Sequence, residues 1–223
     1  MRGCLVLAVK DLRQVLLRGG GAVQAVLLGL LLIFIFSLAT PPGQRVPVQT
    51  AVSIFWLASC FGLVLVFNTL YRLEEQNGLR TALTMAPMPV QAIWLGKLMA
   101  GLVVLLVSQA LFAPGLIVFL GLTGEVNPGL LFGSLMGVNL GLCILGSLIG
   151  AVSQGREARD SLMTIILFPL LVPLLLGGIR LGSAGLGAGD QAEASGWMGL
   201  VAAFDVVFAG AALLLFPYLY RGE

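Results

Sequence analysis

The chain of 223 residues contains no histidine, and only 10% of its residues are charged. A histidine-ligated metal or haem, a histidine general base and a histidine-containing catalytic triad are therefore excluded for this chain by itself. Its three cysteines, Cys4, Cys60 and Cys143, have no CxxC spacing, and no G-x-x-x-x-G-K-[ST] loop is present to hold ATP phosphates. We therefore expect no catalytic residue, no metal site and no directly bound cofactor.

Hydrophobic residues make up 59% of the chain, and its mean hydropathy is +1.05. A soluble domain has about 45–50% apolar and about 25% charged residues. Because a membrane-crossing helix needs about 20 apolar residues, the sequence predicts an all-α polytopic membrane protein with six transmembrane helices. The expected spans are residues 20–39, 51–71, 91–122, 129–152, 161–179 and 198–220.

The first 19 residues have a different character from these spans. On a helical projection, one side carries Leu5, Ala8, Val9, Leu12, Val15 and Leu16, and the other carries Arg2, Lys10, Asp11, Arg13, Gln14 and Arg18. We expect residues 1–19 to form an amphipathic helix in the membrane interface, followed by a transmembrane domain over residues 20–223. The alternative is the start of a cleaved signal peptide.

Positive charge is distributed unevenly between the connections. With six predicted spans, ten of the 12 lysines and arginines fall on one side of the membrane. Only Arg45 and Arg180 fall on the other side. The positive-inside rule then places the side with ten of them, together with both termini, in the cytoplasm. The connections on the non-cytoplasmic side are too short for an external ligand-binding domain.

Three features lie within the predicted spans. Gly133, Gly137 and Gly141 lie on one helix face, which favours close helix packing or, as the alternative, a dimer face. Pro169 and Pro173 predict a kinked or locally unwound fifth span, either as a hinge or as a static kink. Asp205 is the clear intramembrane carboxylate, and it either faces the bundle or serves an ion-coupled carrier.

Residues 72–97, RLEEQNGLRTALTMAPMPVQAIWLGK, are the densest polar stretch and lie on the predicted cytoplasmic side. Pro87 and Pro89 end any helix that precedes them. We expect a short interfacial elbow here, with Trp94 and Lys97 as anchors where the chain re-enters the membrane. The alternative is an ordinary solvated loop.

The elbow resembles that of permease subunits in type-2 ABC exporters through Glu74, Gly78, Leu83, Pro87, Pro89 and Lys97. More narrowly, the chain is similar to the cytochrome c maturation permeases CcmB, also called haem exporter protein B. The similarity includes Tyr71-Arg72, Pro87-Met88-Pro89, the run from Leu95 to Ala100 and the two prolines of span five. The chain departs from that family at Asn68-Thr69, where a Glu-Arg pair is common, and near Thr81, where a Glu is expected.

The resemblance implies a membrane permease that couples to a separate ATP-binding subunit similar to CcmA. That subunit would bind ATP and dock on the elbow and on residues 153–160. The implied elbow residues are Arg72, Glu74, Glu75, Gly78, Arg80, Leu83, Pro87 and Pro89. It further implies two permease copies in a bacterial inner membrane and membrane partners similar to CcmC and CcmD. The complex would act in c-type cytochrome biogenesis, either by delivering haem or by releasing a haem-loaded chaperone. No nucleic acid is expected as a partner.

Three other functions are open from the residues alone. One is a type-2 ABC permease that exports a drug, a lipid or a polysaccharide. Another is a membrane scaffold without transport activity. The third is an ion-coupled carrier centred on Asp205.

Overall fold

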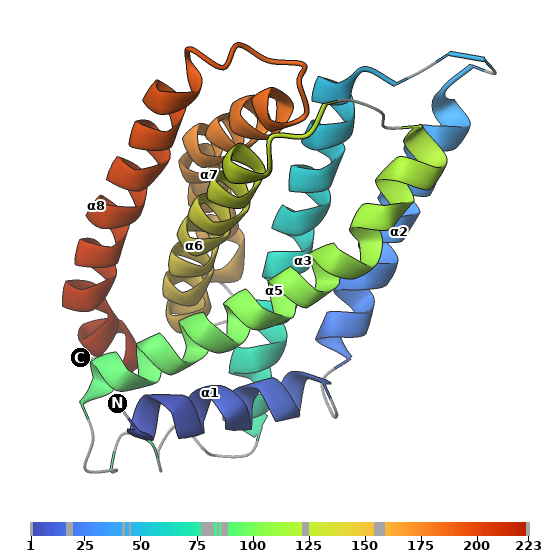
Figure 1. Cartoon of the computed structure of the whole chain (residues 1–223). Coiled ribbons are helices and arrows are strands. Elements are labelled where there is room, and N and C mark those ends of the chain that lie inside the picture. Colours follow the sequence, from blue (N-terminus) through green and yellow to red (C-terminus); the bar gives the residue numbers. More distant parts are fainter. Residues whose placement is uncertain are drawn as a thin grey trace.

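The computed structural model describes residues 2–16, 20–41, 43–44, 46–76, 83, 85, 89–121, 125–153 and 159–221. Within these ranges the chain is helical and contains no strand (Figure 1). The helices are α1 (Arg2–Gln14), α2 (Gly21–Ala39), α3 (Val48–Gln76), α5 (Val90–Leu120), α6 (Pro128–Ser153), α7 (Arg159–Gly185) and α8 (Ala194–Arg221). The structure therefore confirms the predicted all-α polytopic membrane fold.

Five of these helices, α2, α3, α5, α6 and α8, are long and apolar enough to cross a membrane. The helix α7 occupies the position of the fifth expected span, and its described apolar part is Pro169–Gly185. Apolar helices satisfy their own backbone hydrogen bonds, which is what a lipid environment requires of a spanning segment.

The helices α3, α6, α7 and α8 run alongside one another, while α5 crosses the bundle diagonally (Figure 1). The lower end of α5 lies over α1 and beside the end of α8, and its upper end lies beside α2. Both termini are at the same end of the bundle. This arrangement brings α1 and the ends of α3, α5 and α8 together at one end of the molecule.

The helix α1 contacts the protein with one face and leaves apolar side chains exposed on another. Leu7 and Ala8 are buried, and a methyl group on Gly96 of α5 would lie 3.0 Å from Leu7 Cβ. Leu5 and Val9, by contrast, are 57% and 44% exposed. The expected single apolar face is therefore divided between α5 and the outside, because α5 passes directly over α1. Its placement in the membrane interface remains a prediction.

Glycines in three helices receive aromatic rings from α3. Phe67 packs against Gly101 of α5 and Gly146 of α6, where a methyl group on Gly146 would lie 2.8 Å from Phe67 Cδ2. Trp56 covers Gly178 of α7 in the same way. Because glycine has no Cβ, the ring lies directly on the neighbouring backbone, and α3 becomes the central helix of the hydrophobic core.

The three-glycine face of α6 is covered by other helices of the same chain. A methyl group on Gly133 would meet Met198 of α8, and one on Gly137 would lie 3.0 Å from Val201 Cγ1. At Gly141 it would meet Leu174 of α7 and Asp205 of α8. This face is thus packed against α7 and α8 of the same chain, and its role as a dimer face stays a prediction.

The two prolines of α7 do not interrupt it. The helix is continuous from Arg159 to Gly185 with Pro169 and Pro173 inside it. The helix is therefore not interrupted at these prolines, and the predicted kink stays a prediction. The role of these prolines as a hinge remains a prediction.

The packing at Gly141 can be tested with a single methyl group. Gly141→Ala should lower the free energy of unfolding by about 1–3 kcal/mol, because the added Cβ would lie 2.8 Å from both Leu174 methyl groups. Gly210→Ala in α8, where nothing lies within 4 Å, is the matched control and should be neutral or slightly stabilising. Reversible unfolding in mixed micelles measures both, and equal effects would contradict the assignment.

Candidate functional site

Four charged side chains form a cluster at the end of the bundle that holds the termini. Lys97 Nζ of α5 lies 2.8 Å from Glu74 Oε2 of α3, and both side chains are almost fully buried. Asp11 of α1 lies 3.7 Å from Lys97 Nζ and 2.9 Å from Lys10 Nζ. Lys10 Nζ is also 3.8 Å from Glu74 Oε1. The two positive and two negative charges alternate, so the cluster is neutral overall.

Such a cluster needs every partner, because each buried charge has lost its hydration. Attraction between opposite charges offsets this cost only where the pairs are close. The pairing therefore holds α1, the end of α3 and the start of α5 in one arrangement. Lys10 is 30% exposed at the rim, while Lys97 is at the centre with 1% exposure.

Aromatic and hydroxyl groups extend the cluster to α6 and α8. The Tyr220 hydroxyl of α8 donates to Glu74 Oε2 at 3.2 Å. Lys97 Nζ lies 4.7 Å from the centre of the Tyr71 ring, a cation–π contact. Tyr71 Oη donates to the Ser147 carbonyl at 2.7 Å, and Trp94 Nε1 donates to Ser147 Oγ at 2.8 Å. Polar contacts thus join the cluster to four transmembrane helices.

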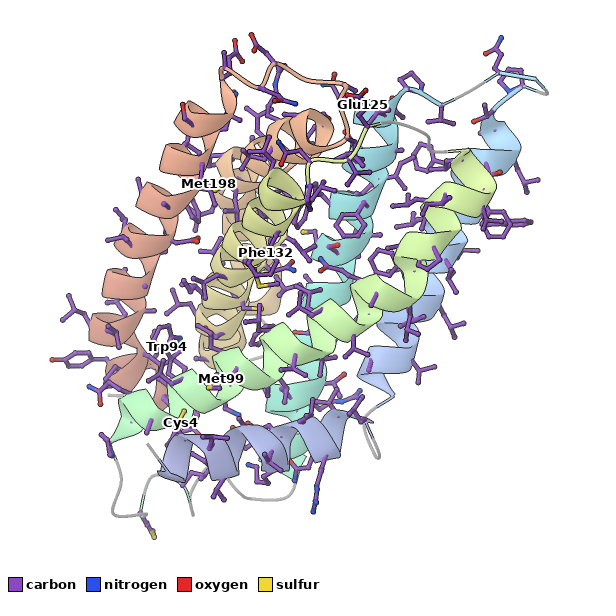
Figure 2. The ribbon with its side chains drawn as sticks, in the orientation of Figure 1. Cys4, Trp94, Met99, Glu125, Phe132 and Met198 are labelled. Atoms are coloured by element: carbon purple, nitrogen blue, oxygen red, sulfur yellow. The ribbon has the colours of Figure 1, made fainter. Side chains whose placement is uncertain are left out.

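The positions of Glu74, Trp94 and Lys97 differ from those expected. Trp94 and Lys97 were predicted as anchors at the membrane surface, but both are buried, and Figure 2 shows Trp94 on the bundle side of α5. Glu74 was expected as a surface contact for a partner, yet it is 2% exposed. The reason is tertiary, because α1 lies across α5 and covers this region. In the same figure Cys4 of α1 lies beside Met99 of α5, with their sulfur atoms 4.0 Å apart.

The other predicted elbow residues are distributed around this cluster. Arg72 is exposed, Leu83 is half-buried against the main hydrophobic core, and Pro89 is extended directly before α5. Gly78, Arg80, Pro87 and the side chain of Glu75 lie outside the described residues. The two ends of the predicted elbow are the last residues of α3 and the first turns of α5. The cluster joins these two helices through Glu74 and Lys97.

A second polar group in the middle of the bundle was missed by sequence reasoning. Gln109 Nε2 of α5 donates to Asn139 Oδ1 at 2.9 Å, and Asn139 Nδ2 donates back to Gln109 Oε1 at 2.7 Å. Gln109 Nε2 also donates to Ser59 Oγ of α3 at 2.8 Å. Isolated amide and hydroxyl side chains in the middle of three apolar spans were the available signal. The group links α3, α5 and α6 through interhelical hydrogen bonds.

Asp205 is in the interior of the bundle and is 7% exposed. Its carboxylate faces Gly141 of α6 and is close to Leu174 of α7, and Oδ1 has no hydrogen-bond partner among the described residues. Among the residues that the structure describes, no group of three or more cysteines, aspartates and glutamates is arranged to hold a metal ion.

Comparison with known proteins gives a consistent result. The sequence model of the family described as CcmB protein matches residues 2–218. Heme exporter protein B of Paracoccus denitrificans (strain Pd 1222) is 28% identical over 182 residues, which cover 80% of this chain and 83% of that protein. The protein of the same name from Bradyrhizobium diazoefficiens is 26% identical over 207 residues, or 90% of this chain and 86% of that protein. No solved structure matches significantly.

Removing one charge from the cluster should destabilise the protein strongly. Glu74→Gln or Lys97→Met should each lower the free energy of unfolding by about 3–5 kcal/mol, because the remaining buried charge loses its partner. The double variant should lose less than the sum of the two, by about 0.5–3 kcal/mol. Reversible unfolding in mixed micelles provides the measurement. Arg13→Gln on the exposed side of α1 is the control, and strict additivity would argue against a coupled cluster.

Proposed function

The chain belongs to the CcmB protein family, and we propose that it is the membrane permease subunit of a haem exporter complex that acts in c-type cytochrome biogenesis. The observation that carries this proposal is the family match from residue 2 to residue 218, together with relatives named heme exporter protein B that align with most of the chain. The chain is a transporter permease and not an enzyme.

The energy for the complex comes, in this proposal, from a separate ATP-binding subunit similar to CcmA that docks on the elbow of residues 72–97. The buried cluster supports this role, because Glu74 and Lys97 are 2.8 Å apart and join the two helices from which the elbow extends. A push on the elbow would therefore act on α3 and α5 together. The contacts of Tyr220 and Ser147 would carry it to α8 and α6.

The proposed surface on which the ATP-binding subunit docks is the exposed part of the elbow. Arg72 and Met85 are exposed, and we propose that Arg72 pairs with an acidic group of the partner. Glu75, Gly78, Arg80 and residues 153–160 complete the proposed surface. Glu74 acts from inside, as a positioning residue that holds the elbow.

The assembly that we propose contains two permease copies and membrane partners similar to CcmC and CcmD, in a bacterial inner membrane with both termini cytoplasmic. Because this chain has no histidine, other subunits provide the imidazole ligands that haem iron commonly takes. ATP-driven movement of the permease then serves haem delivery or the release of a haem-loaded chaperone.

Deletion of the gene tests the cytochrome assignment directly. We expect covalently bound c-type cytochromes, detected by haem staining, to be lost and then restored by the wild-type gene and by Gly210→Ala, a substitution in open space. Normal covalent cytochromes after deletion, in a strain without a second copy, would exclude this function. They would favour export of another substrate or a scaffold.

Charge reversal on the elbow tests the coupling. Arg72→Glu should reduce the ATP-binding subunit retained in mild detergent by about tenfold or more, because a like charge opposite an acidic partner costs several kcal/mol. Arg13→Glu, also an exposed arginine at this end of the molecule, should retain the subunit. If the wild-type chain retains no ATP-binding protein, the coupling proposal is wrong even where the cytochrome assignment holds.

A further inference from the structure

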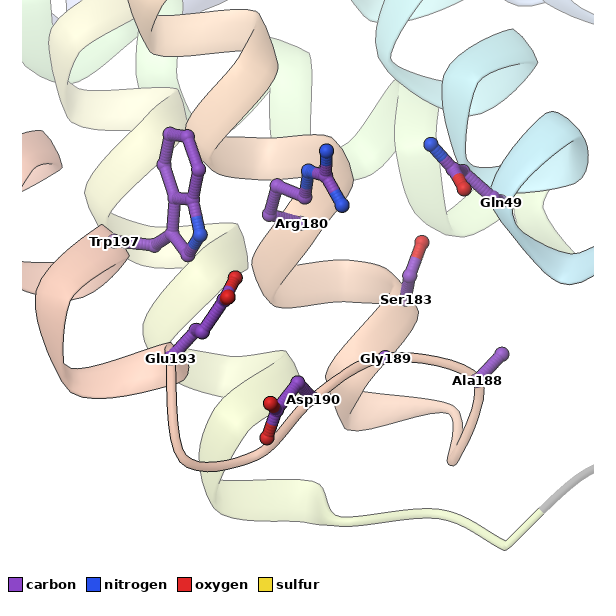
Figure 3. Close-up of a pocket in the computed structure, with 8 residues that line it drawn as sticks. All are labelled: Gln49, Arg180, Ser183, Ala188, Gly189, Asp190, Glu193 and Trp197. Carbon is purple, nitrogen blue, oxygen red and sulfur yellow. The ribbon is translucent and has the colours of Figure 1, made fainter.

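A pocket of about 160 Å³ lies among residues of α3, α7 and α8 (Figure 3). These parts of the helices are at the end of the bundle opposite the termini (Figure 1). The pocket lies where the start of α3, the end of α7 and the start of α8 meet the connection that follows α7. Its polar lining consists of Gln49, Arg180, Ser183, Asp190 and Glu193, and Trp197 is its aromatic wall. None of these residues belongs to the charge cluster or to the elbow.

Hydrogen-bond donors gather on one side of the pocket. In Figure 3 the Arg180 guanidinium, the Gln49 amide and the Ser183 hydroxyl point toward a common space. Ser183 is 4% exposed, and its Oγ has no hydrogen-bond partner among the described residues. Since a buried hydroxyl without a partner is costly, this atom indicates an acceptor that a ligand would supply.

Arg180 is exposed and contacts an aromatic ring. Its guanidinium carbon lies 5.9 Å from the centre of the Trp197 ring, which is a cation–π contact. No carboxylate forms an ion pair with Arg180 within the described part of the chain. The planar guanidinium is therefore available for a bidentate contact with a phosphate or a carboxylate.

On the other side of the pocket the Glu193 carboxylate points inward, whereas the Asp190 carboxylate points away from Arg180 (Figure 3). Asp190 Oδ1 accepts the backbone N–H of Ala192 at 2.8 Å, which fixes the connection before α8. The Glu193 carboxylate points up from the same connection toward the region between Trp197 and Arg180 (Figure 3). A simple anion would meet the Glu193 carboxylate, and a simple cation would meet Arg180, so neither fits the whole pocket.

We propose that this pocket binds a zwitterionic group that carries a primary ammonium and a phosphodiester or carboxylate. The acidic end pairs with Arg180, Ser183 and Gln49, and the ammonium pairs with Glu193. The volume is below the range of about 300–1,000 Å³ found for drug-sized ligands, and it fits a small head group. Both a lipid with an aminoethyl phosphate head group and a soluble amino-phosphate have this chemistry.

The test uses the purified full-length chain in detergent and dissociation constants from ligand-induced shifts in melting temperature. The probes are short-chain lipids with phosphoethanolamine, phosphocholine or phosphoglycerol head groups. We expect the phosphoethanolamine lipid to bind about tenfold more tightly than the other two, because only it combines a phosphate with an ammonium that can donate hydrogen bonds to Glu193. Arg180→Gln should weaken its binding about tenfold, and Glu193→Gln should abolish its preference over the phosphoglycerol lipid.

Three variants act as controls for this experiment. Arg13→Gln, at the other end of the molecule, should bind like the wild type, and Arg180→Lys should retain part of the affinity because it keeps the charge. The melting temperature of Arg180→Gln without ligand should equal that of Arg13→Gln, which shows that the variant folds. Equal affinity for all three lipids, or equal binding by Arg180→Gln and Arg13→Gln, would overturn the proposal.

Soluble O-phosphoethanolamine distinguishes the two sources of the ligand. Binding with the same dependence on Arg180 and Glu193 supports a soluble zwitterion, whereas binding of the lipid alone supports a membrane head group. The cytochrome and co-purification assays do not depend on this pocket. If the pocket binds no zwitterion, the function proposed above is unaffected. If the cytochrome or co-purification assay fails, the pocket proposal is likewise unaffected.

Discussion

The Glu74–Lys97 pair is the contact on which the arrangement of this molecule most depends. Its atoms are 2.8 Å apart in a region closed to solvent, where either charge without the other would be strongly destabilising. Asp11 and Lys10 extend the pairing to α1, and Tyr220 extends it to α8. This neutral cluster of four charges thus fixes the relative positions of α1, α3, α5 and α8 at one end of the bundle.

The packing above this cluster brings α3 into close contact with the neighbouring helices. Phe67 and Trp56 of α3 lie on glycines of the neighbouring helices, and the reciprocal Gln109–Asn139 amide pair joins α5 to α6 in the middle of the bundle. Close backbone contact and interhelical hydrogen bonds are the main attractions available between helices in lipid. These contacts join α3, α5 and α6 to one another away from the charged cluster.

The two ends of the molecule differ in how their charges are used. At the end with the termini, opposite charges contact each other inside the protein and leave Arg72 exposed beside them. At the opposite end, Arg180 and Glu193 line an open pocket and form no ion pair with each other within the described residues. The first arrangement is suited to holding a structure in place, and the second is suited to receiving a ligand.

The sequence by itself determined the membrane class, the helical fold and the approximate ends of the helices, because long apolar segments in lipid must satisfy their backbone hydrogen bonds internally. Its charges and prolines also predict an elbow over residues 72–97, which stays a prediction. Only the tertiary structure decided that Glu74 and Lys97 are buried partners, that Trp94 faces Ser147, and that the Gly141 face contacts α7 and α8. These contacts join residues distant in the chain, and hydropathy and helical periodicity describe one helix at a time. Which polar side chain meets which is set by how α1 and the tilted α5 cross the other helices.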